Sequence, residues 1–281
     1  TAMRVLQGTG VSPGVNAGKP INIERTLDFS NAATISLDEG IKELTAKYKS
    51  IIEKYNSSSR EIEAEVLEAY ILILNDPELI NSLSELNEAN LEQIYNVFLE
   101  QSEVFKQMDD EYFQQRSEDI EAIGKELIFT LQDISIEFDA DVPQVIFANE
   151  LTPNETSSMN LNLVKGFVVK EGGPTSHAVI VAKNYGIPCI LGISIADFDI
   201  DNVEEVIING STGELTINPD ESSLKIVEEY KATTTKQLEN YTEENLNKLG
   251  VELRANIGST DEIKSFKAVS YTHLRAHETT E

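Results

Sequence analysis

The sequence predicts an α/β fold with a long helical block between two strand-rich segments. Three observations support this. Residues 3–24 alternate short apolar runs with Gly and Pro, which indicates strands joined by tight turns. From Leu37 to about Gln132 the apolar residues recur at helical spacing, and short β-rich runs return after Asp139. The chain therefore changes from strands to helices and back.

Composition narrows the possible functions. The 281 residues are enough for two domains with separate cores. The net charge of −27 argues against a nucleic-acid partner, because binding to its phosphates requires Lys and Arg side chains. A single cysteine, Cys189, excludes a disulfide framework and favours the reducing cytoplasm. We find no apolar run long enough to cross a bilayer and no basic, apolar signal segment, so we expect no membrane partner.

The helical block divides into several helices with short breaks. Ser58 and Ser59 are candidate caps for one helix, and Pro77 is typical of the first position of the next. Two further helices are expected at 91–108 and 111–131. Such a series predicts an antiparallel helical bundle, for which a plain scaffold remains an alternative.

Strands are expected in the second strand-rich segment, with one helix start between the first two. The start is a capping box in which Thr152 is the cap, Pro153 occupies the first helical position and Glu155 follows three residues after the cap. A polar helix is expected at 221–249. The expected strands are 144–149, 164–169, 187–193, 203–208 and 214–217.

The sequence EGGPTSHAVIVAKNYGIPCILG, residues 171–192, carries the functional signal. A loop containing Gly172 and Gly173 precedes a helix that Thr175 or Ser176 can cap. His177 then lies in the first helical turn, where backbone N–H groups and the helix dipole favour an anion. This placement suggests a phosphorylated imidazole, although a lone His is also compatible with an ordinary surface or core residue.

This stretch resembles the phosphohistidine signature G-G-x-T-S-H-A-x-I-x-A-(R/K)-x-x-G-I-P-x-x-x-G. Enzyme I of the sugar phosphotransferase system, pyruvate phosphate dikinase and phosphoenolpyruvate synthase share that signature. The opening pattern G-x-x-x-S-P-G-x-x-x-G-K, residues 8–19, resembles enzyme I specifically. Two positions depart from the commonest signature, since Pro174 and Lys183 stand where Arg is usual; Lys183 keeps the charge but not the bidentate fork of Arg.

The resemblance to enzyme I implies a domain plan. A swivelling phosphohistidine α/β domain would comprise residues 1–30 and 138–222, and an all-helical HPr-binding subdomain would be inserted at 31–137. A linker helix would follow at 223–250, and 251–268 would be the truncated start of a phosphoenolpyruvate-binding barrel. Residues 269–281 resemble sequencing-adapter sequence and are expected to be non-native, so His273 and His277 receive no role and no metal site is expected.

The resemblance also implies site residues. His177 would be the phosphohistidine nucleophile, and Thr156 and Asp119 would lie beside its ring. Phosphate-binding positions would be Gly172, Gly173, Thr175, Ser176 and Lys183. The positions carried over for contact with HPr, the small histidine phosphocarrier, would be Tyr70, Leu72, Asp76 and Arg116.

The expected function is phosphoryl transfer from phosphoenolpyruvate to HPr, with this chain carrying the HPr half-reaction. Phosphoenolpyruvate and Mg²⁺ would bind the missing barrel, which would also make the full-length enzyme a homodimer; the fragment would be monomeric and need no cofactor. The alternatives are a phosphohistidine domain of a dikinase, a synthase or a dihydroxyacetone-phosphorylating system. A non-catalytic helical interaction module is a further alternative.

Overall fold

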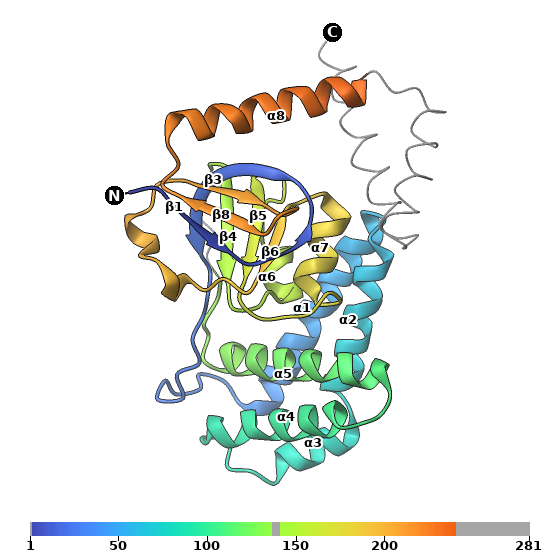
Figure 1. Cartoon of the computed structure of the whole chain (residues 1–281). Helices are drawn as coiled ribbons and strands as arrows, with labels where there is room; N and C mark the ends of the chain where they lie inside the picture. The colour runs from blue at the N-terminus through green and yellow to red at the C-terminus, as the bar shows by residue number, and fades with distance from the viewer. Residues whose placement is uncertain (1, 137–140, 240–281) are drawn as a thin grey trace. The chain divides into compact units, whose positions relative to one another are not determined.

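A computed structural model describes residues 2–136 and 141–239 (Figure 1). The expected barrel start at 251–268, the tail at 269–281 and the end of the expected linker helix lie outside these described residues. The chain divides into two compact units. We name them the sheet unit (residues 1–24, 138–151 and 159–281) and the helical unit (residues 25–137 and 152–158).

The sheet unit is built on a mixed sheet. Its strand order, for the described residues, is β1-β8-β7-β3-β4-β5-β6-β2. Strands β3, β4, β5 and β6 are parallel to their neighbours in that series, whereas β2, β7, β8 and β1 are attached antiparallel. The strands are β1 (Arg4–Gln7), β2 (Thr9–Ser12), β3 (Val15–Asn22), β4 (Gln144–Ala148), β5 (Val164–Val169), β6 (Cys189–Leu191), β7 (Val206–Asn209) and β8 (Glu214–Ile217).

Two apolar cores cover the faces of this sheet. Successive residues of β5 point to opposite faces, so Phe167 and Val169 enter one core and Val168 enters the other. Helix α7 (His177–Tyr185) packs on the first face through its apolar stripe. Helix α8 (Glu221–Glu239) follows the last strand, and the short 3₁₀ helices η1 (Ile195–Asp197) and η2 (Ile200–Asn202) lie between β6 and β7. The cores therefore fix the start of α7 against the central strands.

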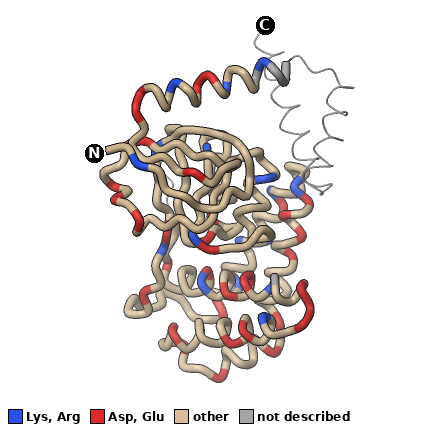
Figure 2. The backbone as a smooth tube through the Cα atoms, viewed as in Figure 1, with Lys and Arg blue, Asp and Glu red and all other residues tan. Residues whose placement is uncertain are grey.

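The helical unit has one continuous apolar core, which includes the aromatic rings of Tyr48, Tyr55, Tyr70 and Phe98. Apart from α2 (Glu61–Leu74), its described helices begin at a residue whose side chain accepts a backbone hydrogen bond, and Ser36 forms a reciprocal capping box with Glu39. The helices are α1 (Leu37–Ser57), α2 (Glu61–Leu74), α3 (Pro77–Ser84), α4 (Leu91–Lys106), α5 (Glu111–Leu131) and α6 (Pro153–Ser157). Figure 2 marks the positions of Asp and Glu in red along the backbone of these helices, as expected for an acidic bundle.

Most expected elements are present, with corrections at their ends. Pro77 is the first residue of α3, and helix 111–131 has the expected bounds. Ser58 and Ser59 do not cap α2, because Ser58 ends α1, Ser59 has a left-handed backbone (φ 60°) and Arg60 occupies the cap position. Among the described residues, no helix combines the length and the apolar character that crossing a membrane requires.

The two units also differ from the expected domain plan. Residues 25–30 and 152–158 belong to the helical unit rather than to the phosphohistidine domain. The physical reason is a buried ionic cluster in which Arg25 and the start of α6 contact Glu126 of α5. A segment that lies between two sheet strands in sequence is therefore held by the helices.

Candidate functional site

His177 is the first residue of α7 and follows the loop that leaves β5. Gly172 has a backbone φ of +127°, a conformation that side-chain-bearing residues rarely adopt, and this allows the loop to turn sharply. The Ser176 amide donates to the Gly173 carbonyl at 3.0 Å. The imidazole is consequently held at a helix N-terminus directly after a glycine loop.

The packing of α7 explains why this geometry is rigid. Ala178, Val181 and Ala182 are buried, and they lie in one core with Phe167 and Cys189. Gly186 ends the helix in the left-handed conformation (φ 63°). Burial raises the pKa of the Cys189 thiol to about 12, so this thiol packs as an apolar group and has no thiolate character at pH 7.

The electrostatics of the loop keep the His177 imidazole neutral at the start of α7. Burial lowers the pKa of the half-buried His177 ring from 6.5 to about 4, so the ring is neutral at pH 7. Ser176 stands at the cap position, yet its hydroxyl makes no capping bond and its Oγ is buried without a hydrogen-bond partner among the described residues. A phosphoryl oxygen at the start of α7 could accept from that hydroxyl.

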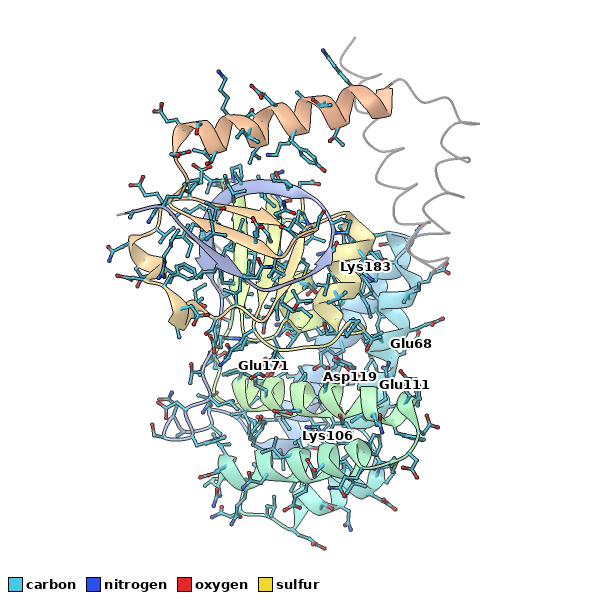
Figure 3. All side chains as sticks on the ribbon, viewed as in Figure 1. Glu68, Lys106, Glu111, Asp119, Glu171 and Lys183 are labelled. Carbon is cyan, nitrogen blue, oxygen red and sulfur yellow. The ribbon has the colours of Figure 1, made fainter. Side chains whose placement is uncertain are left out.

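The expected phosphate-binding residues are only partly brought together. Gly172, Gly173, Thr175 and Ser176 form the loop directly before His177. Lys183 lies in the last turn of α7, six residues and therefore about 9 Å along the helix axis from His177. Figure 3 labels Lys183 on α7 and Glu171 in the preceding loop. The position of Lys183 thus gives no support to a direct role in the glycine loop.

Asp119 lies on α5 in the helical unit and has a partner on each carboxylate oxygen. The Tyr70 hydroxyl donates to Oδ1 at 2.9 Å, and Arg116 Nη1 lies 3.0 Å from Oδ2. Burial raises the pKa of Asp119 to about 6, although Arg116 and the Tyr70 hydrogen bond oppose this shift. Asp119 is therefore mainly ionised at pH 7 and titrates just below neutrality.

Thr156 lies on α6 and is buried. The helix begins as predicted, with Thr152 Oγ1 accepting from the Glu155 amide and Pro153 at the first position. The return bond of the predicted capping box is replaced, because the Glu155 carboxylate pairs with Arg25 at 3.3 Å instead. The Thr156 hydroxyl donates to the Thr152 and Pro153 carbonyls, both at 3.3 Å.

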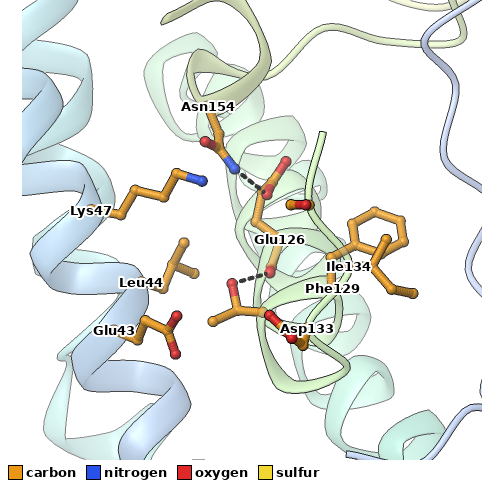
Figure 4. Close-up of a pocket in the computed structure, with 10 residues that line it drawn as sticks. Glu43, Leu44, Lys47, Glu126, Phe129, Asp133, Ile134 and Asn154 are labelled. Carbon is orange, nitrogen blue, oxygen red and sulfur yellow. Dashed lines mark hydrogen bonds between the residues drawn. The ribbon is translucent and has the colours of Figure 1, made fainter. Parts of the chain in front are cut away.

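A cluster centred on Glu126, which the sequence analysis did not identify, anchors α6. The Glu126 carboxylate accepts from Arg25 at 2.6 Å, from Thr152 at 2.9 Å and from Asn154 at 2.8 Å. Asn154 and Glu126 also line a small polar pocket that α1 borders through Lys47 (Figure 4). The sequence does contain one indication of this cluster, because Glu126 is an acidic residue next to the apolar positions of α5. It also follows Asp119 by seven residues, which places both carboxylates on one face of the helix.

The residues expected to dock a partner lie in different environments. Leu72 on α2 is 74% exposed, and Glu65 and Glu68 on the same helix are exposed. Asp76 is exposed and caps α3 by accepting from the Leu79 amide. Tyr70 requires a correction: it was expected on the docking surface, but it is 2% exposed, because its ring packs in the helical core.

Comparisons with known proteins agree with this architecture. A family model for the N-terminal segment of PEP-utilising enzymes matches residues 7–116, and a model for the mobile domain of PEP-utilising enzymes matches residues 140–213. Both models describe PEP-utilising enzymes, and the chain is similar to them over these two segments. The second match contains the glycine loop and His177, and the first contains Tyr70 and Arg116.

Two of the curated relatives that match the chain share one name. Phosphoenolpyruvate-protein phosphotransferase of Bacillus subtilis (strain 168) is 30% identical over 285 residues, which cover 93% of this chain and 50% of that protein. The Priestia megaterium enzyme is 30% identical over 282 residues, covering 92% of this chain and 49% of its own length. The chain therefore spans about half the length of the curated relatives it matches.

Solved structures show the same fold. The solution structure of Enzyme I (nEIt) matches with a TM-score of 0.55 and 26% identity, covering 82% of this chain and 99% of that one. An N-terminal domain of Enzyme 1 - Nitrogen matches with a TM-score of 0.51 and 21% identity, and covers 82% of this chain. These matches confirm the predicted α/β fold with a helical subdomain.

Proposed function

We propose that this chain carries a phosphoryl group on His177 and exchanges it with HPr, as the N-terminal half of a phosphoenolpyruvate-protein phosphotransferase. The observation that carries the proposal is the position of His177: it is a neutral imidazole at the first residue of α7, after a glycine loop, within the segment that matches the mobile domain. Anions are stabilised at such helix starts.

The chemistry is a nucleophilic exchange at phosphorus. The lone pair of one His177 ring nitrogen forms a new N–P bond, the N–P bond to the donor imidazole of phospho-HPr breaks, and the bonding pair returns to the donor nitrogen. Such a transfer depends mainly on positioning and on stabilisation of the charge on the equatorial oxygens. The low pKa of His177 keeps its lone pair available throughout the neutral pH range.

The neighbouring groups have separate roles in this proposal. Backbone N–H groups from Gly173 to Ser176, and the Ser176 hydroxyl, bind the phosphoryl oxygens. Asp119 stabilises the positive charge on the phosphorylated imidazole, which its ionisation at pH 7 permits. Thr156 orients the imidazole or the phosphoryl group through its hydroxyl. Asp119 and Thr156 belong to the helical unit, and His177 belongs to the sheet unit.

HPr binds the helical unit. Leu72 is an exposed apolar centre with exposed carboxylates on the same helix, which suits a partner whose apolar patch is bordered by Lys and Arg. Arg116 contributes near this surface, although it also pairs with Asp119.

The reaction with phosphoenolpyruvate belongs to the second half of the longer protein. We place phosphoenolpyruvate binding, Mg²⁺ binding and dimerisation there, since the relatives are about twice as long as the matched segment. The cytoplasm is the compartment in which such a phosphotransferase would work.

The test is phosphoryl transfer from isotopically labelled phospho-HPr to the chain. We expect the chain to acquire an acid-labile, base-stable phosphate, and we expect His177→Ala to fold normally and acquire none. Full labelling of His177→Ala would overturn the assignment, and absence of label on the unmodified chain would overturn the proposed function itself.

A further inference from the structure

We infer that Tyr70 is a positioning residue for phosphoryl transfer, because its hydroxyl orients the Asp119 carboxylate from inside the helical core. This inference rests on the proposed function, in which Asp119 stabilises the phosphorylated imidazole. It gives Tyr70 a role that differs from the surface contact expected from the sequence.

The geometry restrains the carboxylate from two sides. Tyr70 on α2 donates to Asp119 Oδ1 at 2.9 Å, while Arg116, one turn before Asp119 on α5, lies 3.0 Å from Oδ2. Each oxygen therefore has its own donor, and rotation of the carboxylate about its terminal bond would break both contacts. The orientation of Asp119 is set by two helices rather than by its own rotamer preference.

Tyr70 is itself held tightly. Its side chain is 2% exposed, and its ring packs edge-on against the Tyr48 ring with the centroids 5.7 Å apart. A buried phenol hydroxyl without a hydrogen-bond partner destabilises the fold, because its hydration is lost without replacement. The Asp119 carboxylate is a strong acceptor for the Tyr70 hydroxyl. The donor is therefore preorganised before any partner or phosphoryl group arrives.

The neighbouring Tyr48 shows that a tyrosine can pack in this core without a hydrogen bond from its hydroxyl. Tyr48 is equally buried, with 1% exposure, yet its hydroxyl has no hydrogen-bond partner among the described residues. The two tyrosines share one environment and differ in whether the hydroxyl contacts a functional carboxylate. This pair gives a matched control that separates packing from positioning.

The electrostatics give the positioning role a measurable signature. Burial raises the pKa of Asp119 to about 6, the Arg116 charge and the Tyr70 hydrogen bond lower it, and Glu118 raises it. Besides burial, the charges of Glu126 and Arg25 shift the pKa of the neighbouring Tyr48 hydroxyl, and Tyr48 in turn contributes to the raised pKa of Tyr70. Loss of the Tyr70 hydroxyl therefore raises the pKa of Asp119 toward neutrality.

Helix α2 gives this arrangement a second significance. Leu72, two residues after Tyr70, is 74% exposed on the opposite side of the helix. The helix that presents the proposed docking residue to HPr thus also supplies the donor that orients Asp119.

The test compares Tyr70→Phe with Tyr48→Phe in two measurements. The first is the Asp119 pKa, followed by carboxyl-carbon NMR titration, which needs no partner. The second is the rate of phosphoryl transfer from phospho-HPr between pH 5 and 8. A hydrogen bond to an ionised group is worth enough to move a pKa by roughly one unit. Tyr70→Phe should therefore raise the Asp119 pKa by roughly one unit and move the acid limb of the rate profile by the same amount, while Tyr48→Phe should change neither.

Thermal unfolding controls for a loss of folding, and a double variant controls for indirect effects. If the hydroxyl acts through Asp119, adding Tyr70→Phe to Asp119→Asn should change the transfer rate by less than about twofold. An unshifted Asp119 pKa in Tyr70→Phe, or an equal shift in Tyr48→Phe, overturns the inference while leaving the proposed function standing. Failure of the unmodified chain to accept phosphate overturns the proposed function, and the titration still decides whether Tyr70 sets the Asp119 pKa.

Discussion

The sheet unit and the helical unit hold their functional groups by different physical means. In the sheet unit, His177 is placed by a contiguous stretch of chain: a strand, a glycine loop and a helix start. In the helical unit, Asp119 and the α6 segment are placed by buried side chains from distant parts of the sequence, such as Arg25 with Glu126. Backbone geometry therefore fixes His177 within the sheet unit, and buried charge fixes the α6 segment within the helical unit.

This difference predicts that the stability of the helical unit depends on its buried charges far more than on its exposed ones. Arg25 is the cation that contacts both Glu126 and Glu155, at 2.6 and 3.3 Å, and its guanidinium also stacks 4.2 Å from the centre of the Phe129 ring. Arg25→Met should destabilise the protein by about 3–5 kcal/mol, because it leaves the buried Glu126 carboxylate without its cationic partner. Urea unfolding at pH 7 measures the loss.

Lys42→Met is the matched control for that prediction. Lys42 forms an i,i+4 pair with Asp38, and both side chains are about three-quarters exposed. Exposed pairs contribute little, so this variant should unfold like the unmodified protein. Equal destabilisation by the two substitutions would remove the distinction between buried and exposed charge on which the comparison depends.

The next largest effect is a pH dependence that comes from Glu155. Burial and the Glu126 carboxylate raise the pKa of Glu155 from 4.5 to about 8. The protonated side chain therefore contributes its full stabilisation of the folded state below pH 4.5. This contribution is lost as the pH rises to 8. Glu155→Gln keeps a neutral side chain at every pH. Across this range, the unfolding free energy of the unmodified protein should fall relative to that of the variant by at most about 1.4 kcal/mol per pH unit. Parallel curves for the two proteins would show that Glu155 is ionised in the fold.

A smaller effect separates close packing in the helical unit from open space in the glycine loop. A Cβ atom on Gly124 of α5 would lie 2.6 Å from Phe98 Cβ, whereas one on Gly173 would meet nothing within 4 Å. Gly124→Ala should cost about 1 kcal/mol, since overpacking outweighs the gain in helix propensity. Gly173→Ala should leave the melting temperature within a few degrees. A reversed order of the two melting temperatures would contradict the packing described for α5.

The same contrast explains how much could be predicted from the sequence. The loop around His177, the bounds of β5 and α5, and the cap and Pro at the start of α6 all follow from local patterns, and the structure contains them. Two conclusions did not follow from local patterns. Tyr70 was expected on the surface because the resemblance to enzyme I carried it over as a contact position, but the three-dimensional packing turns its ring inward.

The assignment of residues 152–158 to the helical unit was missed for a related reason. Their sequence position between β4 and β5 suggests the sheet, and only the long-range bonds from Thr152 and Asn154 to Glu126 show where they are held. Contacts across 26 or 28 residues leave no periodic trace in a sequence.

The most direct test of the division between chemistry and recognition is calorimetric titration of HPr into three variants at two salt concentrations. Leu72→Ala should weaken binding by more than ~1 kcal/mol at both, because it truncates an exposed apolar centre. Asp76→Asn keeps a side chain able to cap α3 and removes one charge, so it should weaken binding mainly at low salt. His177→Ala should bind unphosphorylated HPr with nearly unchanged affinity, because the proposed docking residues lie on the helical unit and the imidazole, whose proposed role is transfer, lies on the sheet unit. A loss of binding in His177→Ala as large as that in Leu72→Ala would contradict the account, since recognition and chemistry would then share one surface.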